Sequence, residues 1–270
     1  MQYKEVAGGI CAPKGFAAAG VHCGIRANHS EKYDLALIKA NIRCAAAGVY
    51  TTNKVCGAPI KVDRAHLTDG YAQAIVVNSG NANTCAANGV ALAEECCELV
   101  GKALNIDAKD VLPSSTGVIG QPMVIDPFAR GIPAAAAKLA ADAQGSTDAA
   151  TAIMTTDTHK KEYAIQFELG GKSCTVGAIG KGSGMIAPNM ATMLAFYTTD
   201  AADMYYRTDH HWTTEGAQTA YGVWCAATGH ADQSWTLTPM STTFRGTLYS
   251  KVLLPDSPYD TVSIASSAAI

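Results

Sequence analysis

The sequence predicts an α/β protein, and three observations lead to this prediction. Apolar runs rich in Val and Ile, such as 74–77, lead into loops of Gly, Asn and Ser, as buried strands commonly do. Apolar residues then recur at helical spacing, which predicts helices. Later in the chain, apolar residues alternate on both sides of a Gly-Gly pair, a pattern typical of a β-hairpin.

Length and composition indicate one large or two modest globular domains. The chain has 270 residues, 48% hydrophobic and 16% charged, which is enough to bury a proper core. A net charge of −3 gives no basic surface for nucleic acid, and no Lys/Arg cluster indicates membrane attachment. The N-terminus lacks a targeting pattern, and no apolar stretch reaches the ~18 residues of a membrane helix. We expect a cytoplasmic protein with small-molecule partners.

The nine cysteines are an odd number and show no Cys-x-x-Cys spacing. Neither a disulfide framework nor a zinc site is indicated, and no bound metal is expected. Most of these cysteines are expected to be buried as small hydrophobic residues, which is the usual behaviour of free cysteine.

Local patterns predict the first elements. Residues 7–54 are rich in Gly, Ala and β-branched residues, and 48–53 are expected to end a buried strand. Residues 74–83 predict a strand that runs into a Gly/Asn loop, because Asn tolerates left-handed backbone angles. A helix is expected over 89–104, where four apolar residues share a helical face and most charged residues lie on the others.

The following elements repeat this alternation. Residues 111–120 read as an apolar entry followed by a small polar loop, and the Ala-rich stretch 132–143 as a second helix. A hairpin over 163–176, with its turn at 170–171, leads directly to Lys181. Polar loops on a rigid scaffold are where functional sites tend to lie.

The composition changes near residue 200. All three tryptophans lie in the last 70 residues, and the preceding 200 contain none. We therefore predict two domains, 1–200 and 201–270, with the boundary at 200–203.

The run 181–196 has the features of a self-cleaving threonine site. A threonine hydroxyl is a weak nucleophile, and one way to activate it is to make the residue an N-terminus whose amine accepts the proton. Cutting between Ala191 and Thr192 would create such an amine, which titrates near ~7.7–8.0 and can act as a base at neutral pH. By itself, a threonine in an apolar run such as Met-Ala-Thr-Met-Leu reads as an ordinary strand residue.

Five segments of the first 200 residues carry a resemblance to one known family. They are Gly48–Asn53, Asn78–Asn83, Ser114–Gly120, Met154–Asp157 and Lys181–Phe196. Through them the chain resembles the glutamate N-acetyltransferase family, also called ornithine acetyltransferase, of arginine biosynthesis. The resemblance implies the layered α/β fold of that family and a precursor that cuts itself before the threonine into α and β chains, which form a hetero-oligomer. It also implies acetyl transfer from N-acetylornithine to glutamate through an acetyl-threonine intermediate.

The family pattern assigns the reacting groups. It makes Thr192 the nucleophile and gives the oxyanion hole to the Thr116 side chain and the Gly117 backbone N–H. Losing one such donor commonly costs ~10²–10³ in rate, and a glycine lets the backbone come close to the reacting group. Without the resemblance, Ser114–Gly117 reads as an ordinary turn.

The resemblance also implies substrate contacts. Lys181 and Thr155 match substrate-binding positions, with Thr156 as the near alternative, and an ammonium would hold the amino acid's carboxylate. Without the resemblance, Lys181 reads as a solvated surface charge, and Asn78–Asn83 is expected to position loops rather than to react. No cofactor is implied, although some members use acetyl-CoA as an acetyl donor and the sequence leaves that open.

The last part of the chain, 203–270, resembles an internal fragment of the DHHW proteins, relatives of SGNH-type esterases. Two runs carry it, Tyr-Arg-Thr-Asp-His-His-Trp-Thr and Phe-Arg-Gly-Thr-Leu-Tyr-Ser-Lys. In those proteins an Asp-x-His pair serves a serine nucleophile, and Asp209 and His211 match that pair. An O-acyl esterase fragment is therefore an alternative function. Metal binding by the Asp-His-His run is a weaker option, because adjacent histidines point different ways in most backbones.

The family pattern is incomplete in this chain. In the family, a β portion of about equal length follows the threonine and supplies further substrate contacts, a glutamate, an asparagine and a threonine. An inactive chimeric or truncated product is thus a second alternative. A shortened domain exposes apolar surface, and we expect 1–200 to be recognisably folded while the remainder packs loosely.

Overall fold

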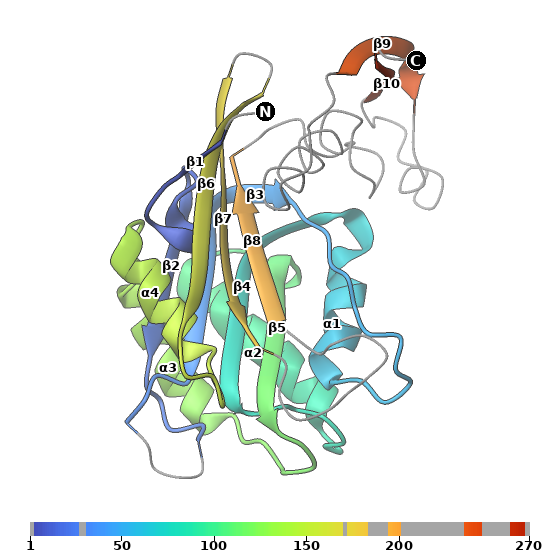
Figure 1. The fold of residues 1–270 in the computed structure, drawn as a ribbon. Coiled ribbons are helices and arrows are strands. Elements are labelled where there is room, and N and C mark those ends of the chain that lie inside the picture. The colour runs from blue at the N-terminus through green and yellow to red at the C-terminus, as the bar shows by residue number, and fades with distance from the viewer. Residues whose placement is uncertain are drawn as a thin grey trace. The chain divides into compact units, whose positions relative to one another are not determined.

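The computed structural model shows two compact units (Figure 1). The larger unit comprises Glu5–Ile165 and Thr175–Thr199, and the smaller one Met1–Lys4, Gln166–Cys174 and Asp200–Ile270. The structure describes residues 3–26, 31–169, 172–182, 194–200, 235–244 and 260–267, the last two as backbone strands.

A four-stranded sheet of order β2-β3-β4-β5 forms the centre of the larger unit. Its strands are β2 (Phe16–Val21), β3 (Leu35–Ala45), β4 (Tyr71–Asn81) and β5 (Val111–Val118). The pairs β2–β3 and β3–β4 are antiparallel, whereas β4 and β5 are parallel. The helix α2 (Gly89–Leu104) lies between these parallel strands in the chain, as a parallel connection requires. The carboxyl ends of β4 and β5 therefore lie side by side.

A second sheet has the order β1-β6-β7-β8. Its strands are β1 (Tyr3–Glu5), β6 (Lys161–Leu169), β7 (Lys172–Lys181) and β8 (Leu194–Thr199). The strands β7 and β8 are antiparallel, and their register pairs Lys181 with Leu194. Figure 1 shows β6, β7 and β8 crossing one face of the β2–β5 sheet.

Side chains that alternate along the central strands fill two different cores. In β3, Leu35 and Leu37 pack with the helices α1 (Ala58–His66), α2 and α3 (Asp126–Ala137), while Ala36 and Ile38 face the other way. That second face packs against α4 (Ala143–Ala152) and against residues of β7 and β8. Strand side chains alternate between the faces of a sheet, so the order of layers is helices, sheet, and then a layer of α4 with the second sheet. Short 3₁₀ turns complete the unit at Gly9–Cys11, Leu67–Asp69 and Ala108–Asp110.

The α/β class, the helix over 89–104 and the hairpin are confirmed. The helix α2 has the predicted bounds, and its buried residues include Ala93, Cys97 and Val100. It is followed by Asn105, which adopts the left-handed conformation (φ 55°) that is common just after a helix. The strands β6 and β7 are the predicted hairpin, and the predicted turn at 170–171 lies outside the described residues.

Three predictions about strands and the loops that follow them are wrong. Residues 48–53 do not end a buried strand, because β3 ends at Ala45 and the Val49 side chain is 99% exposed. The side chains of β3 are no longer buried after Ala40, so the segment that follows this strand does not pack against the core. Residues 78–81 continue β4 and residues 114–118 continue β5 instead of forming loops, since the two strands pair there.

The predicted helix over 132–143 is also wrong in its bounds. The helix α3 begins six residues earlier, with Pro127 in its first turn, and ends at Ala137. A new helix, α4, begins at Ala143 after the N-cap residue Asp142. The Ala-rich sequence carries too little polar contrast to mark either end. The helix α1 has no counterpart among the predicted elements, although Pro59 lies in its first turn, where proline is favoured.

In the smaller unit, β9 (Trp235–Phe244) and β10 (Asp260–Ser267) form an antiparallel pair. Two paired strands do not identify a fold class, so the relation of this part to SGNH-type proteins and the boundary at 200–203 stay predictions. None of the helices in the described part of the chain could span a lipid bilayer.

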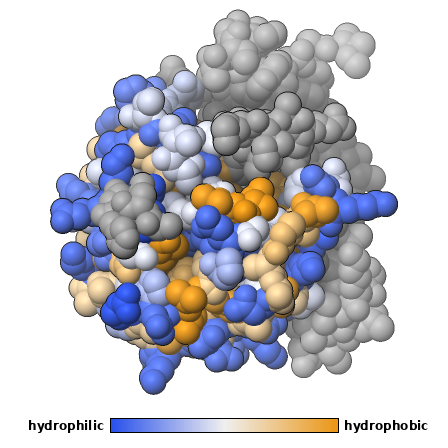
Figure 2. All heavy atoms as spheres, turned by 90° about the horizontal axis from the view of Figure 1, so that it is seen from below, coloured by the Kyte–Doolittle hydropathy of each residue, from blue (hydrophilic) through white to orange (hydrophobic). Residues whose placement is uncertain are grey.

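Several large apolar side chains are exposed in the described part of the chain. They include Ile42, Val49, Val55, Val118, Ile119, Val124, Tyr163 and Tyr197. On the face drawn in Figure 2, apolar atoms form separate patches with polar atoms between them. Separate exposed apolar residues are normal on globular proteins and do not by themselves indicate a binding surface.

Candidate functional site

Hydrogen bonds fix the carboxyl ends of β4 and β5 to each other. The Ser115 hydroxyl donates to Asn78 Oδ1 at 2.6 Å, and the buried Asn78 amide donates to the Asn81 carbonyl at 2.8 Å. The Asn81 Oδ1 in turn accepts the Asn83 backbone N–H at 2.8 Å. The predicted role of Asn78–Asn83 as a segment that positions loops agrees with these contacts. They give the edge of the sheet a defined shape.

Glycine at 117 lets the end of β5 approach β4 very closely. Its φ is +136°, and a Cβ there would lie 2.3 Å from the Gly80 carbonyl carbon and 2.6 Å from the Asn81 nitrogen. No side chain fits such a distance. The residue is nevertheless exposed on its other side, so a reacting group can come close to its backbone.

Lys181 and Thr116 meet at this edge. The Lys181 Nζ donates a hydrogen bond to Thr116 Oγ1 at 3.1 Å, and Lys181 is only 7% exposed. An ammonium donates and never accepts, so the hydrogen of the Thr116 hydroxyl is left to be given to another group. Burial lowers the pKa of Lys181; the negative charge of Asp157 opposes this and the positive charge of Lys161 adds to it.

Asp157 connects three parts of the site. Its carboxylate accepts the Gly182 backbone N–H at 2.7 Å, the Thr155 backbone N–H at 3.3 Å and the Lys161 ammonium at 2.7 Å. Burial alone would raise the pKa of Asp157, but these hydrogen bonds outweigh it and lower the pKa to about 2. The charged carboxylate thereby holds the turn at Thr155 against the chain that leaves β7.

The predicted site residues are partly brought together. Thr116 and Lys181 are in contact, and Thr155 is tied through Asp157 to the residue after Lys181. Thr156 is exposed.

Four predicted residues lie outside the described part of the chain. They are the cleavage residues Ala191 and Thr192 and the tail residues Asp209 and His211.

Asp157 is a residue that the sequence analysis missed. It lies in the Met-Thr-Thr-Asp segment of the resemblance, but the only other local signal is Lys161 four residues later, which is typical of a surface ion pair. The contact to Gly182 joins residues 25 positions apart, and no local pattern reports such a contact.

A small cavity lies between the ends of β4 and β5 and the helices α2 and α3, and it is too small to bind a substrate. It is bordered by Asn78, Asn83, Ser114 and Ser115 among others, and its volume is about 10 Å³. This is room for about one water molecule, too little for an amino acid.

The chain is similar to proteins of known sequence and structure. A family model described as the ArgJ family matches residues 17–220. The arginine biosynthesis bifunctional protein ArgJ of Symbiobacterium thermophilum is 51% identical over 198 residues, which are 73% of this chain and 49% of that protein. The chloroplastic relative from Zea mays is 42% identical over 201 residues, 74% and 43% of the two chains. The chain thus spans about half the length of the curated relatives it matches.

Two crystal structures share the fold. The ArgJ protein of Bacillus halodurans is 35% identical with a TM-score of 0.65, covering 72% of this chain and 98% of that one. Ornithine acetyltransferase from Mycobacterium tuberculosis, complexed with ornithine, is 36% identical with a TM-score of 0.64, covering 72% and 100%. Because the family model covers more than half of the sequence and these folds agree, the chain belongs to the ArgJ family.

Proposed function

We propose that this protein is an acetyltransferase that moves acetyl from N²-acetylornithine to glutamate, through an ester on Thr192. The observation that carries the proposal is the contact of Lys181, at the end of β7, with Thr116 near the end of β5. Leu194, the second residue after Thr192 in the chain, is paired with Lys181 in the same place. Membership of the ArgJ family and the likeness to an ornithine acetyltransferase support the substrate class.

The proposed reaction begins with the cut that frees the nucleophile. The Thr192 hydroxyl attacks the Ala191 carbonyl, the peptide C–N bond breaks, and water hydrolyses the resulting ester to leave a carboxylate on Ala191 and an amine on Thr192. That amine takes the hydroxyl proton when Thr192 attacks the acetyl carbonyl of the substrate. The amide C–N bond breaks, the ornithine amine leaves with the proton, and the glutamate amine later takes the acetyl group from the ester.

In this proposal, Thr116 and Gly117 stabilise the oxyanion that forms at each attack. Because Lys181 donates to Thr116 Oγ1, the Thr116 hydroxyl hydrogen can point at the developing charge. An ammonium has three hydrogens, so Lys181 also keeps donors for the substrate carboxylate. Thr155, or its neighbour Thr156, lies beyond Asp157 as the further substrate contact.

The wider properties follow the family resemblance and are proposals as well. We propose a cytoplasmic α/β hetero-oligomer with N-acetylornithine and glutamate as partners, without a cofactor. Whether acetyl-CoA also serves as an acetyl donor is tested by supplying it in place of N-acetylornithine and measuring the N-acetylglutamate formed.

The test of the proposal replaces Thr192. The wild-type chain should yield a fragment of residues 192–270 in an intact-mass measurement and should take label from acetyl-labelled N-acetylornithine on Thr192. Thr192→Ala should do neither, whereas Thr68→Ala, on a surface turn, should do both. If the Thr192→Ala protein is still cut between 191 and 192, or if wild-type Thr192 never carries label, the proposal is wrong.

Lys181→Met tests the two proposed roles of Lys181 without touching the nucleophile. Losing the ammonium frees the Thr116 hydroxyl to turn and removes a donor for the substrate carboxylate, so acetyl transfer should fall by about 10²-fold. Lys138→Met, at an exposed lysine after α3, is the control and should leave the rate unchanged. An unchanged rate in Lys181→Met would contradict the assignment.

For residues 203–270 we propose the partial relationship to DHHW proteins, with Asp209 and His211 as the pair that would serve an esterase. Only the two sequence runs support it, and the ArgJ family model reaches residue 220 and so overlaps the first of them. Ester hydrolysis that disappears in His211→Ala and persists in Thr192→Ala would support this relationship. Absence of hydrolysis in the wild-type chain would remove it.

A further inference from the structure

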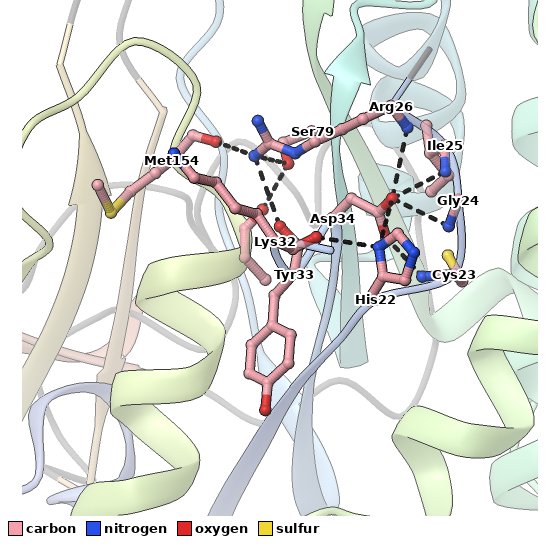
Figure 3. Close-up of polar contacts among 11 residues, drawn as sticks. His22, Cys23, Gly24, Ile25, Arg26, Lys32, Tyr33, Asp34, Ser79 and Met154 are labelled. Carbon is pink, nitrogen blue, oxygen red and sulfur yellow. Dashed lines mark hydrogen bonds and ion pairs between the residues drawn. The ribbon is translucent and has the colours of Figure 1, made fainter. Parts of the chain in front are cut away.

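A fully buried carboxylate organises the loop that precedes β3 (Figure 3). Asp34 is 0% exposed, and its oxygens accept the backbone N–H groups of Cys23, Gly24, Ile25 and Arg26 at 2.7, 3.0, 2.8 and 3.4 Å. His22 Nδ1 lies 3.6 Å from the same carboxylate. Consecutive N–H groups that converge on one anion fix the course of a loop. The loop therefore presents Arg26 in a defined direction.

Arg26 extends from this loop to two other elements. Its Nη2 donates to the Ser79 hydroxyl of β4 at 2.7 Å and to the Met154 carbonyl just after α4. Figure 3 shows the guanidinium between Ser79 and Met154. Arg26 also passes close to Gly80, where an added Cβ would be 2.9 Å from Arg26 Cγ.

Ser79 extends the connection to the end of α4. Its hydroxyl accepts from Arg26 and donates to the Ala152 carbonyl at 2.6 Å. The last carbonyls of a helix carry partial negative charge, so a guanidinium placed there is favourable. Two carbonyls at the end of α4, those of Ala152 and Met154, are thus tied to one residue of β4 and to Arg26.

The residues that Arg26 binds are next to residues of the candidate site. Met154 directly precedes Thr155, and Ser79 directly precedes Gly80, which is the strand partner of Gly117. Neither Arg26 nor Asp34 belongs to the residues that the family pattern assigns to chemistry. What they hold together is the backbone on either side of the proposed substrate site.

We propose that Arg26, aimed by Asp34, is a positioning residue that sets the spacing between the oxyanion residues Thr116–Gly117 and the substrate contact Thr155. This inference rests on the proposed function for its meaning in catalysis. Its structural content, the fixing of the 153–158 segment by Arg26, is measurable without any reaction.

Hydrogen exchange followed by mass spectrometry of the full chain is the test. In Arg26→Met, amides in 153–158 should exchange about tenfold faster, because a charge-assisted hydrogen bond to this segment is lost. Peptides within α2 should keep the wild-type rate. Asp34→Asn, which removes the anion that aims Arg26 but leaves Arg26 in place, should show the same local change. Arg64→Met, at an exposed arginine stacked on Tyr50, is the control and should match the wild type.

Chemical rescue separates positioning from general support of the fold. Methylguanidinium added to Arg26→Ala should slow exchange in 153–158 again and should restore part of the lost kcat/KM for acetyl transfer. Wild-type exchange in 153–158 of the Arg26 variants would overturn the inference. So would a rise spread equally over all peptides in both Arg26→Met and the milder Arg26→Lys. A wild-type chain that transfers no acetyl refutes the proposed function instead, and the exchange data still decide on the role of Arg26.

Discussion

Single atoms decide the geometry at the edge of the central sheet. The absent Cβ of Gly117 is one example, because β5 could not otherwise lie against the Gly80 carbonyl. The carboxylate of Asp157 is another, since it holds the amides of both Thr155 and Gly182. A substitution at either position should therefore disturb mainly the contacts of that residue.

Gly117→Ala should cost about 3 kcal/mol or more of the free energy of unfolding, because the new methyl group would overlap the backbone of Gly80. Urea denaturation measures this. Gly120→Ala is the matched control: Gly120 also has a positive φ, +78°, but has nothing within 4 Å of an added Cβ. It should lose only the ~1–2 kcal/mol of left-handed strain. Equal losses in both variants would show that the close approach at Gly117 is unimportant.

Asp157→Asn should lower the free energy of unfolding by about 2 kcal/mol at pH 7. An asparagine offers one oxygen, so its amide group would face one of the two backbone N–H donors. The pKa of Asp157 is about 2 in the folded protein against an ordinary value of 3.8. Its contribution is therefore complete above about pH 4 and is lost as the pH falls through about 2.

The measurement compares Asp157→Asn with the wild type by denaturation at several pH values, and with Glu95→Gln, an exposed acid on α2, as control. The difference from wild type should shrink as the solution is acidified. A difference that stays constant from pH 7 to pH 3 would contradict the lowered pKa.

At the scale of elements, α4 leads into the segment that carries the proposed substrate contact Thr155. It begins at the N-cap Asp142, whose carboxylate accepts the Gly145 N–H at 2.9 Å, and its far end is the point that Arg26 and Ser79 hold. Asp142→Ala should cost about 1 kcal/mol of the free energy of unfolding. Asp142→Asn, which keeps an acceptor in the cap, should cost clearly less. Both are read from urea denaturation, and equal costs would mean that the cap does not act through this hydrogen bond.

Elements with a strong local pattern could be predicted from the sequence. The amphipathic pattern of 89–104 gave the bounds of α2, because apolar and charged residues separate cleanly on its faces. The end of α3 and the start of α4 could not be located, since alanine is compatible with both sides of a helix and the cap Asp142 lies inside the predicted helix. The stretch 48–53 has the residue types of a buried strand but no partner strand.

The candidate site was predictable only as a set of residues. The resemblance placed Thr116 and Lys181 in one site, but their contact joins residues 65 positions apart and depends on how the two sheets stack. The network of Asp34 and Arg26 had no signal at all, because backbone N–H groups do not appear in a sequence pattern. The positions of Ala191 and Thr192 stay predictions.

At the scale of the whole molecule, burial separates the cysteines into classes. Cys85 is exposed, whereas Cys11, Cys96, Cys97 and Cys174 are buried in the described structure, and the remaining three described thiols are intermediate. Four of these eight cysteines are thus buried, fewer than the sequence analysis expects. Burial raises the pKa of Cys11 to about 11 and that of Cys96 to about 12, which leaves almost no thiolate at neutral pH.

Brief labelling of the folded protein at pH 7.5 with iodoacetamide should therefore modify Cys85 first among the described cysteines. Peptide mass spectrometry measures the extent at each site. Cys96 and Cys97 should react only after unfolding, and a Cys85→Ser variant should lose the fast-reacting thiol. Rapid labelling of Cys96 in the native protein would mean that the core beneath α2 opens readily.

The strand β8 follows the proposed cut and is bonded on two sides. It pairs with β7 from Lys181↔Leu194 to Val176↔Thr199, and the Thr198 hydroxyl donates to the Ile10 carbonyl at 2.6 Å. Scission between 191 and 192 would therefore act as a nick in a molecule that stays in one piece. Native gel filtration would report a single species before and after processing, and only a denaturant would reveal two polypeptides.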